Sequence, residues 1–406
     1  MKKKLFNRDF ILLLQANAVS TIGDLMCSVA TGYWVYEKTG SNALLGIMSS
    51  ISMFVVMLLS PFTGSIVDKS NRKWLMVGMD VMQGILMITV GILAHLDLLN
   101  VPGVLLTAFL AAVGSVFYSP AANTLLLDII PRDDMVRGQS IFSGCNSLIS
   151  TLGTAVSGVV VAFFGVPLIV ILNGVSNLYS AFSEMFIRVP RSVQQGEAVT
   201  VKSVLSDSRQ AVKDIFQDKF LRLFIPMNLI INLLGAGCLT LILPFCLEKG
   251  FSVEHYGYLM TAFTVGSLLC VLLLSVVKLK PAARFWVMAL GFCGYTVFAV
   301  LAFLSRSFPA VFAFLIVAAF LNCAGNTIFN ASQMLALPEK NRGAIMGFVQ
   351  SASTGGSALS ALVYGLLGDV FPLYLVFAVG SIIAFIPMLY LCANPLTKKF
   401  ILEYTE

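Results

Sequence analysis

Apolar stretches of about twenty residues recur along almost the whole chain, and they constrain its fold more than any other feature. Each stretch is long enough to cross a hydrocarbon layer ~30 Å thick as a helix. Backbone groups in lipid must be hydrogen-bonded within the segment, and the alternating pattern of barrel strands is absent from this sequence. Only 11% of the residues are charged, against about 25% in soluble domains. The sequence therefore predicts an all-α membrane protein.

Twelve membrane spans are predicted, six in each half of the chain. The loop 189–218 separates a six-helix bundle over 1–188 from a second bundle over 219–406. The later part of this loop has the apolar face of a helix lying at the membrane surface, and a solvated linker is the alternative. The predicted spans are 10–36, 43–67, 74–96, 102–127, 138–164, 166–188, 219–247, 255–277, 282–304, 308–334, 343–367 and 371–393.

Basic residues are distributed unevenly between the two sides that these spans define. All but three of the 26 Lys and Arg residues fall on the side of the N-terminus, the exceptions being Lys38, Lys249 and Arg306. Because Lys and Arg are retained in the cytoplasm during insertion, we expect a multi-pass protein of the cell membrane with both termini cytoplasmic. The net charge of +6 thus reflects orientation in a lipid bilayer, and we expect no nucleic-acid partner.

The two halves of the sequence resemble each other. The segment STLGTAVS at 150–157 aligns with STGGSALS at 353–360, at an offset of 203 residues. The same offset pairs Gly165 with Gly368. Two parallel halves related by an axis along the membrane normal form a recurring transporter plan. We therefore expect two six-helix pseudo-repeats.

The segment GSIVDKSNRK at 64–73 lies between the second and third predicted spans. It resembles the G-x-x-x-D-(R/K)-x-G-R-(R/K) signature of the major facilitator superfamily. Asn71 stands where the family usually has glycine, and asparagine tolerates the left-handed backbone geometry that glycine adopts. The resemblance implies the major facilitator fold, a monomer, and a gating role on the cytoplasmic side for Gly64, Asp68, Lys69, Arg72, Lys73 and, two turns further on, Asp80.

The run FYSPAANTLLLDIIP at 117–131 resembles the branch that holds macrolide-efflux-type drug:proton antiporters, lysophospholipid transporters and siderophore exporters. In the superfamily, the first, fourth, seventh and tenth helices line a central cavity. The corresponding predicted helices here carry polar residues spaced by four, which the resemblance makes candidates for binding substrate. The alternative for each is a hydrogen bond between helices. These residues are Ser115, Ser119, Asn123, Asn228, Asn232, Asn322, Asn326 and Asn330.

Ionisable residues inside a membrane are costly to bury and are therefore functional candidates. Asp24 is the deepest in the predicted spans, and it shares a helix face with Asn17 and Ser20, as expected for a helix that lines a polar cavity. Asn17 and Ser20 are therefore also candidates for lining the substrate cavity. A desolvated carboxyl without a fixed cation is a candidate for binding the coupling proton. The alternative is a structural carboxyl bonded to a neighbouring helix.

Two further acidic residues stand near predicted span ends. Glu184 and Arg188 are four residues apart, which predicts a local ion pair. Asp128 is interpreted as a boundary residue.

These observations predict a secondary transporter that exports an amphipathic small molecule, such as a drug or lipophilic metabolite, in exchange for protons. Lysophospholipid or siderophore transport and a non-transporting scaffold or sensor are the alternatives. An enzyme is not expected, because the chain has only two, unrelated histidines. An ATP-driven pump is not expected either, because the sequence contains no phosphate-binding loop. The eight cysteines form no metal-binding pattern, so we expect neither metal nor cofactor.

Overall fold

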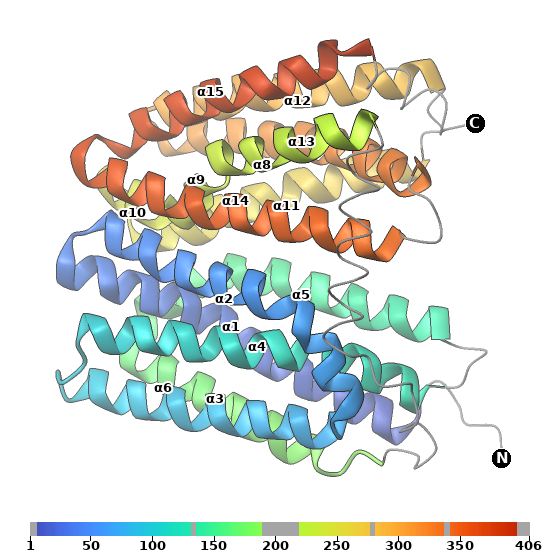
Figure 1. Ribbon diagram of the computed structural model, residues 1–406. Coiled ribbons are helices and arrows are strands. Elements are labelled where there is room, and N and C mark those ends of the chain that lie inside the picture. The colour runs from blue at the N-terminus through green and yellow to red at the C-terminus, as the bar shows by residue number, and fades with distance from the viewer. Residues whose placement is uncertain (1–5, 131–134, 189–218, 277–280, 337–341, 396–406) are drawn as a thin grey trace. The chain divides into compact units, whose positions relative to one another are not determined.

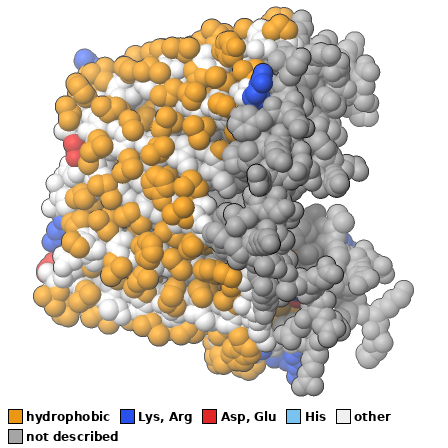
Figure 2. All heavy atoms as spheres, in the orientation of Figure 1, with side chains coloured by type: hydrophobic (Ala, Val, Ile, Leu, Met, Phe, Trp, Pro, Cys, Tyr) orange, Lys and Arg blue, Asp and Glu red, His pale blue; other side chains and the backbone are white. Residues whose placement is uncertain are grey.

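The computed structural model describes residues 6–130, 135–188, 219–276, 281–336 and 342–395. The described chain is built of helices, and ten are long and apolar enough to cross a membrane, or eleven when the bent α5 is counted as one span. On the described part of the face drawn in Figure 2, hydrophobic side chains are widespread and the few charged side chains lie near its edges. The predicted all-α membrane fold is confirmed.

Two compact units divide the chain. The first comprises Met1–Gly40 and Ile51–Val204, and the second comprises Ser41–Ser50 and Leu205–Glu406. The domain bounds predicted from the sequence stay a prediction, and the surface helix expected within 189–218 lies outside the described residues. The helices of the first half are α1 (Arg8–Thr39), α2 (Asn42–Lys69), α3 (Arg72–His95), α4 (Val101–Ile129), α5 (Met135–Phe164) and α6 (Val166–Glu184).

The second half begins with a helix that is broken into three pieces, and five long helices follow (Figure 1). The pieces are α8 (Lys219–Gly235), α9 (Gly237–Thr240) and α10 (Ile242–Glu248). The long helices are α11 (Val253–Val276), α12 (Pro281–Leu304), α13 (Phe308–Ala336), α14 (Arg342–Val370) and α15 (Leu373–Ala393).

The helices of the two halves pack in the same pattern. In the first, α1 packs on α5 and α6, and α3 packs on α4 and α6. In the second, α8 packs on α14 and α15, and α12 packs on α13 and α15. Each first helix also donates an amide hydrogen bond to the fifth, from Asn17 to Asn146 in one half and from Asn228 to Ser353 in the other. This shared pattern agrees with two six-helix pseudo-repeats.

Asn71 is the N-cap of α3, which differs from the left-handed geometry considered for it in the sequence. Its backbone is extended, at φ −72° and ψ 101°, and its side-chain oxygen accepts a hydrogen bond from the Trp74 backbone N–H. Left-handed geometry is therefore not what asparagine provides here. It provides an N-cap, which satisfies a backbone N–H that the first turn of a helix leaves without a partner.

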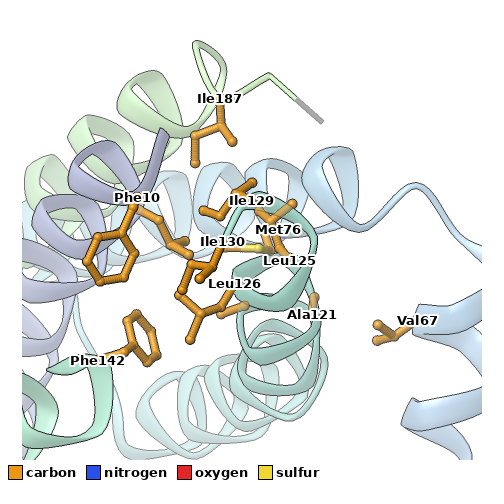
Figure 3. Close-up of a cluster of buried hydrophobic side chains, with 12 residues drawn as sticks. Phe10, Val67, Met76, Ala121, Leu125, Leu126, Ile129, Ile130, Phe142 and Ile187 are labelled. Carbon is orange, nitrogen blue, oxygen red and sulfur yellow. The ribbon is translucent and has the colours of Figure 1, made fainter. Parts of the chain in front are cut away.

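A buried apolar cluster closes the end of the first unit at which α1 and α3 begin and α4 ends (Figure 3). Phe10, Met76 and Leu125 are fully buried in it. Beside this cluster, the guanidinium of Arg72 donates to the Asp128 carboxylate at 2.6 Å, with side-chain exposures of 16% and 8%. Asp128 is therefore more than a boundary residue, because it neutralises a nearly buried cation at the start of α3.

Helices α3 and α6 run side by side at very short range (Figure 1). A Cβ atom added at Gly174 would lie 2.7 Å from the Gly84 carbonyl oxygen and 2.8 Å from the Ile88 backbone nitrogen. Because both of these atoms are backbone, the neighbouring helix cannot yield by a rotamer change. Small residues thus permit the α3–α6 contact, as is common between membrane helices.

We expect Gly174→Ala to destabilise the protein by roughly 1–3 kcal/mol, because the added methyl overpacks this contact. The control is Gly78→Ala on α3, where an added Cβ meets nothing within 4 Å and helix propensity changes stability by at most about 1 kcal/mol. Thermal unfolding in detergent, followed by a dye that reacts with buried thiols such as Cys27, measures both. Equal melting temperatures for the two variants would contradict the close packing.

We expect Asp128→Asn to cost about 3 kcal/mol, because it removes the charge that Asp128 places 2.6 Å from the nearly buried guanidinium of Arg72. The matched control is Asp97→Asn, which removes the ion pair with Lys38. In this pair, the Asp97 side chain is 83% exposed and the Lys38 side chain is 52% exposed. An exposed pair contributes about 0–1 kcal/mol. The same thermal assay checks both, and a double variant with Arg72→Gln should recover part of the loss. Similar small effects at both sites would show that Arg72 does not depend on Asp128.

Candidate functional site

Asp24 lies at the middle of α1, and its residue surface is exposed. Its carboxylate also reaches the interior, where the Asn177 side-chain amide of α6 donates to it at 3.5 Å. The Asn177 amide donates in addition to the Asn173 side-chain oxygen at 3.2 Å. Asp24 thus connects an open face of α1 with a buried polar row on α6, and no ion pair joins it to a described Lys or Arg.

Asn17 and Ser20 do not share this open face. Both residues are buried, the Asn17 amide donates to Asn146 of α5, and the Ser20 hydroxyl donates to the Asn17 carbonyl oxygen at 3.3 Å. The structure therefore places Asn17 as a link between α1 and α5, and Ser20 as a buried hydroxyl that bonds its own helix. Their assignment to a substrate cavity stays a prediction.

The polar residues of α4 lie on an exposed face of the first unit. Ser115, Ser119 and Asn123 are all exposed. The Ser115 hydroxyl donates to the Ala111 carbonyl oxygen at 3.0 Å, and the Asn123 amide donates to the Ser119 carbonyl oxygen at 3.0 Å. The Ser115 and Asn123 side chains thus donate to their own helix, and their oxygens remain available to a ligand as acceptors.

In the second unit, the predicted asparagines of two helices line one cavity of about 300 Å³. The Asn232 amide donates to the Asn228 side-chain oxygen at 3.0 Å within α8, and the Asn326 amide donates to the Asn322 side-chain oxygen at 2.8 Å within α13. The rest of the wall is mostly apolar, and its large side chains include Tyr295, Phe224, Phe292, Phe329, Met288 and Met388. The cavity is therefore amphipathic, with neutral amides set among large apolar side chains.

The structure describes the segment that resembles the family signature only in part. Gly64, Asp68 and Lys69 lie in α2, but their side chains, like that of Asn330 in α13, are outside the described residues. The Lys73 ammonium donates to the Met185 carbonyl oxygen at 2.6 Å, which ties the start of α3 to the residue after α6. With the Arg72–Asp128 pair, this bond holds the ends of α3, α4 and α6 together.

Glu184 corrects another expectation, because it forms no ion pair with Arg188. It is the last residue of α6, so the helical spacing that would join the two does not continue to position 188. The Arg188 backbone N–H donates instead to the Asp9 carboxylate at 3.1 Å. Glu184 is buried and accepts a hydrogen bond from the Tyr118 hydroxyl at 2.9 Å.

A row of buried polar residues on α6 was not predicted from the sequence. Asn173, Asn177, Ser180 and Glu184 follow one another at intervals of four, three and four residues, and each is at most 1% exposed. This spacing places them on one helix face, and it is the signal that could have found them. Asp80 of α3 lies against this row, since its electrostatic and polar neighbours are Ser180, Glu184 and Asp24.

Among the described residues, no group of His, Cys, Asp and Glu side chains is arranged to hold a metal ion. The chemistry that this arrangement offers is the binding of protons by carboxyl groups and of an amphipathic ligand by amides and aromatic rings.

The sequence is similar to those of bacterial efflux proteins. It is 22% identical over 182 residues to macrolide efflux protein A of Streptococcus pyogenes, covering 45% of each chain. It is 24% identical over 217 residues to the putative bacilysin exporter BacE of Bacillus subtilis, covering 51% of each. These alignments thus span about half the length of the curated relatives.

Two solved structures share the fold. A bacterial homolog of the human lysosomal transporter Spinster has a TM-score of 0.74 at 15% identity and covers 99% of both chains. The nucleoside transporter NupG has a TM-score of 0.74 at 14% identity, covering 95% of this chain and 99% of that one. The Major Facilitator Superfamily profile matches residues 13–247 and 227–403. The chain therefore belongs to the major facilitator superfamily.

Proposed function

We propose that this chain is a proton-coupled secondary transporter that exports an amphipathic small molecule by alternating access. The observation that carries the proposal is the cavity of about 300 Å³ in the second unit, where four asparagines lie among aromatic and methionine side chains. Flexible and aromatic walls suit varied greasy ligands, and a few fixed polar groups orient them. Two relatives, named as a macrolide efflux protein and a putative bacilysin exporter, support export as the direction of transport.

Asp24 is the proposed site of proton coupling. It stands at the middle of α1, it is open on one side, and its contacts toward the interior are neutral amides. A carboxyl in such a place can change protonation as its surroundings change, which would allow proton binding and substrate binding to favour different facing states. With both termini cytoplasmic, as the distribution of basic residues predicts, uptake of an external proton would drive substrate outward.

We expect Asp24→Asn to abolish uptake of a radiolabelled macrolide driven by a pH gradient in proteoliposomes, while exchange without a gradient remains. The amide keeps the shape and the hydrogen bonds of the carboxyl and cannot release a proton. Ser28→Ala, one turn further along the same exposed face of α1, is the control and should retain gradient-driven transport. Undiminished transport by the Asp24 variant would rule out this assignment.

We expect Asn322→Ala to raise the KM for the macrolide by about 5- to 150-fold, which corresponds to the roughly 1–3 kcal/mol of a lost buried hydrogen bond. The Asn322 amide lines the cavity, and its side-chain oxygen accepts a hydrogen bond from Asn326. Thr89→Ala is the control, because that exposed hydroxyl of α3 donates only to the Ile85 carbonyl oxygen. An unchanged KM for both variants would place the substrate elsewhere.

Lysophospholipid transport is the second candidate, and a separate groove favours it. This groove, of about 480 Å³, runs between α8, α14 and α15 and is lined by apolar side chains together with Tyr364 and Gly380. An acyl chain would fit such a lining. Flux of labelled lysophospholipid and of labelled macrolide separates the candidates. A lysophospholipid that is a substrate would itself be transported, whereas a lipid that is only bound in the groove would not be transported and would leave macrolide transport unchanged. A scaffold or sensor would transport neither.

A further inference from the structure

Three buried oxygen atoms without a hydrogen-bond partner lie between α3 and α6. They are Asp80 Oδ2, Ser180 Oγ and Glu184 Oε2, on residues that are 2%, 0% and 1% exposed. The Ser180 hydroxyl lies beside both carboxyl groups but does not meet the geometry of a hydrogen bond to either. Leaving buried polar atoms unpaired is costly, so this cluster is built to receive something that satisfies them.

The two buried carboxyl groups lie on packed helices, within electrostatic reach of each other. Asp80 and Glu184 interact electrostatically, and no ion pair joins either to a described Lys or Arg. The nearby cations are engaged elsewhere: Arg72 is paired with Asp128, and Lys73 bonds the Met185 carbonyl oxygen. Of the titratable groups on the packed elements, Asp24 of α1 and Tyr118 of α4 interact with the pair. Asp9 accepts from the Arg188 backbone, Asp128 is paired with Arg72, and Arg137 of α5 is exposed.

We propose that Asp80 and Glu184 form a carboxyl pair that binds one proton, and that this pair is a second protonation site beside Asp24. Two ionised carboxylates this deeply buried would repel each other and lack solvation. One added proton removes one of the two charges. The O–H bond that it forms on one carboxyl also supplies a donor to the carboxyl oxygens, in addition to the Ser180 hydroxyl. The Tyr118 hydroxyl, which donates to Glu184 Oε1, fixes the orientation of the pair.

A proton fits this site better than a metal cation. The described residues hold no group of three or more His, Cys, Asp and Glu side chains that could bind a metal ion, and Mg²⁺ usually keeps several bound waters. The cluster is also fully enclosed, which leaves little room for the water that would complete a coordination shell.

The pair is electrostatically linked to Asp24, which is among the charges acting on Asp80. A proton taken up at one site therefore weakens the repulsion felt at the other. This link rests on the proposed role of Asp24, whereas proton binding by the pair does not. If coupling uses both sites, one proton moves from one carboxyl to another: its O–H bond breaks on the first and forms on the second, and the total charge does not change.

Infrared difference spectroscopy of the full-length protein in liposomes tests the pair directly. The carbonyl band of a protonated carboxylic acid shifts in D₂O and disappears on ionisation. We expect this band to persist in Asp24→Asn, and the double variant Asp80→Asn with Glu184→Gln to lose it. Tyr118→Phe should shift the band, because it removes the donor to Glu184. A band that is unchanged in the double variant would overturn the proposal.

A second measurement guards against misfolding and against a different occupant. The wild-type band is recorded at fixed pH in NaCl and in choline chloride, which needs no variant. We expect identical spectra, and a band that disappears only with Na⁺ would overturn the proposal in favour of a cation site. Transport by Asp24→Asn is read separately, so failure of the proposed coupling residue leaves this outcome unaffected. Ser183→Ala, on the same helix, is the matched control and should keep the band.

Discussion

The constraint on which this structure depends is that lipid offers no partner to a polar group. Every backbone donor and acceptor in a span must be satisfied within its helix, which is why the described chain is helical nearly throughout. The same constraint acts on side chains. Polar residues in the spans donate back to their own helix, as Thr89 and Thr107 do, or reach across to another helix, as Asn17 and Asn228 do. Groups that do neither stand out as sites.

Much of the fold was predictable because lipid leaves so few alternatives. Long apolar stretches announce spans without any tertiary information, and the sidedness of basic residues counts them. The family signature placed Arg72 and Lys73 where they tie helix ends together. What the sequence could not supply is which face of each helix is covered. Asn17 and Asp24 share a face by periodicity, yet Asn17 is buried by α5 whereas Asp24 is exposed.

The errors have a common physical origin in helix ends. Asn71 was interpreted as a residue that tolerates the left-handed geometry of glycine, and it instead caps α3 with an extended backbone. Glu184 was expected to pair with Arg188, but it is the last residue of its helix. A change of one turn in where a helix begins or ends moves a side chain from surface to interior. The polar row on α6 was overlooked for a different reason, because each asparagine and serine is unremarkable alone and only their spacing is informative.

The two halves share a packing pattern but differ in their chemistry. The described spans of the first half bury Asp80 and Glu184 and hold Asp24 at mid-helix. The described helices around the cavity of the second half, α8, α12, α13 and α15, present neutral amides and contain no Asp or Glu. A neutral cavity avoids the cost of desolvating a charge when a greasy ligand enters. On the proposed function, protons and substrate would therefore not compete for one carboxyl. Their coupling would have to arise from differential binding to two conformations of the protein.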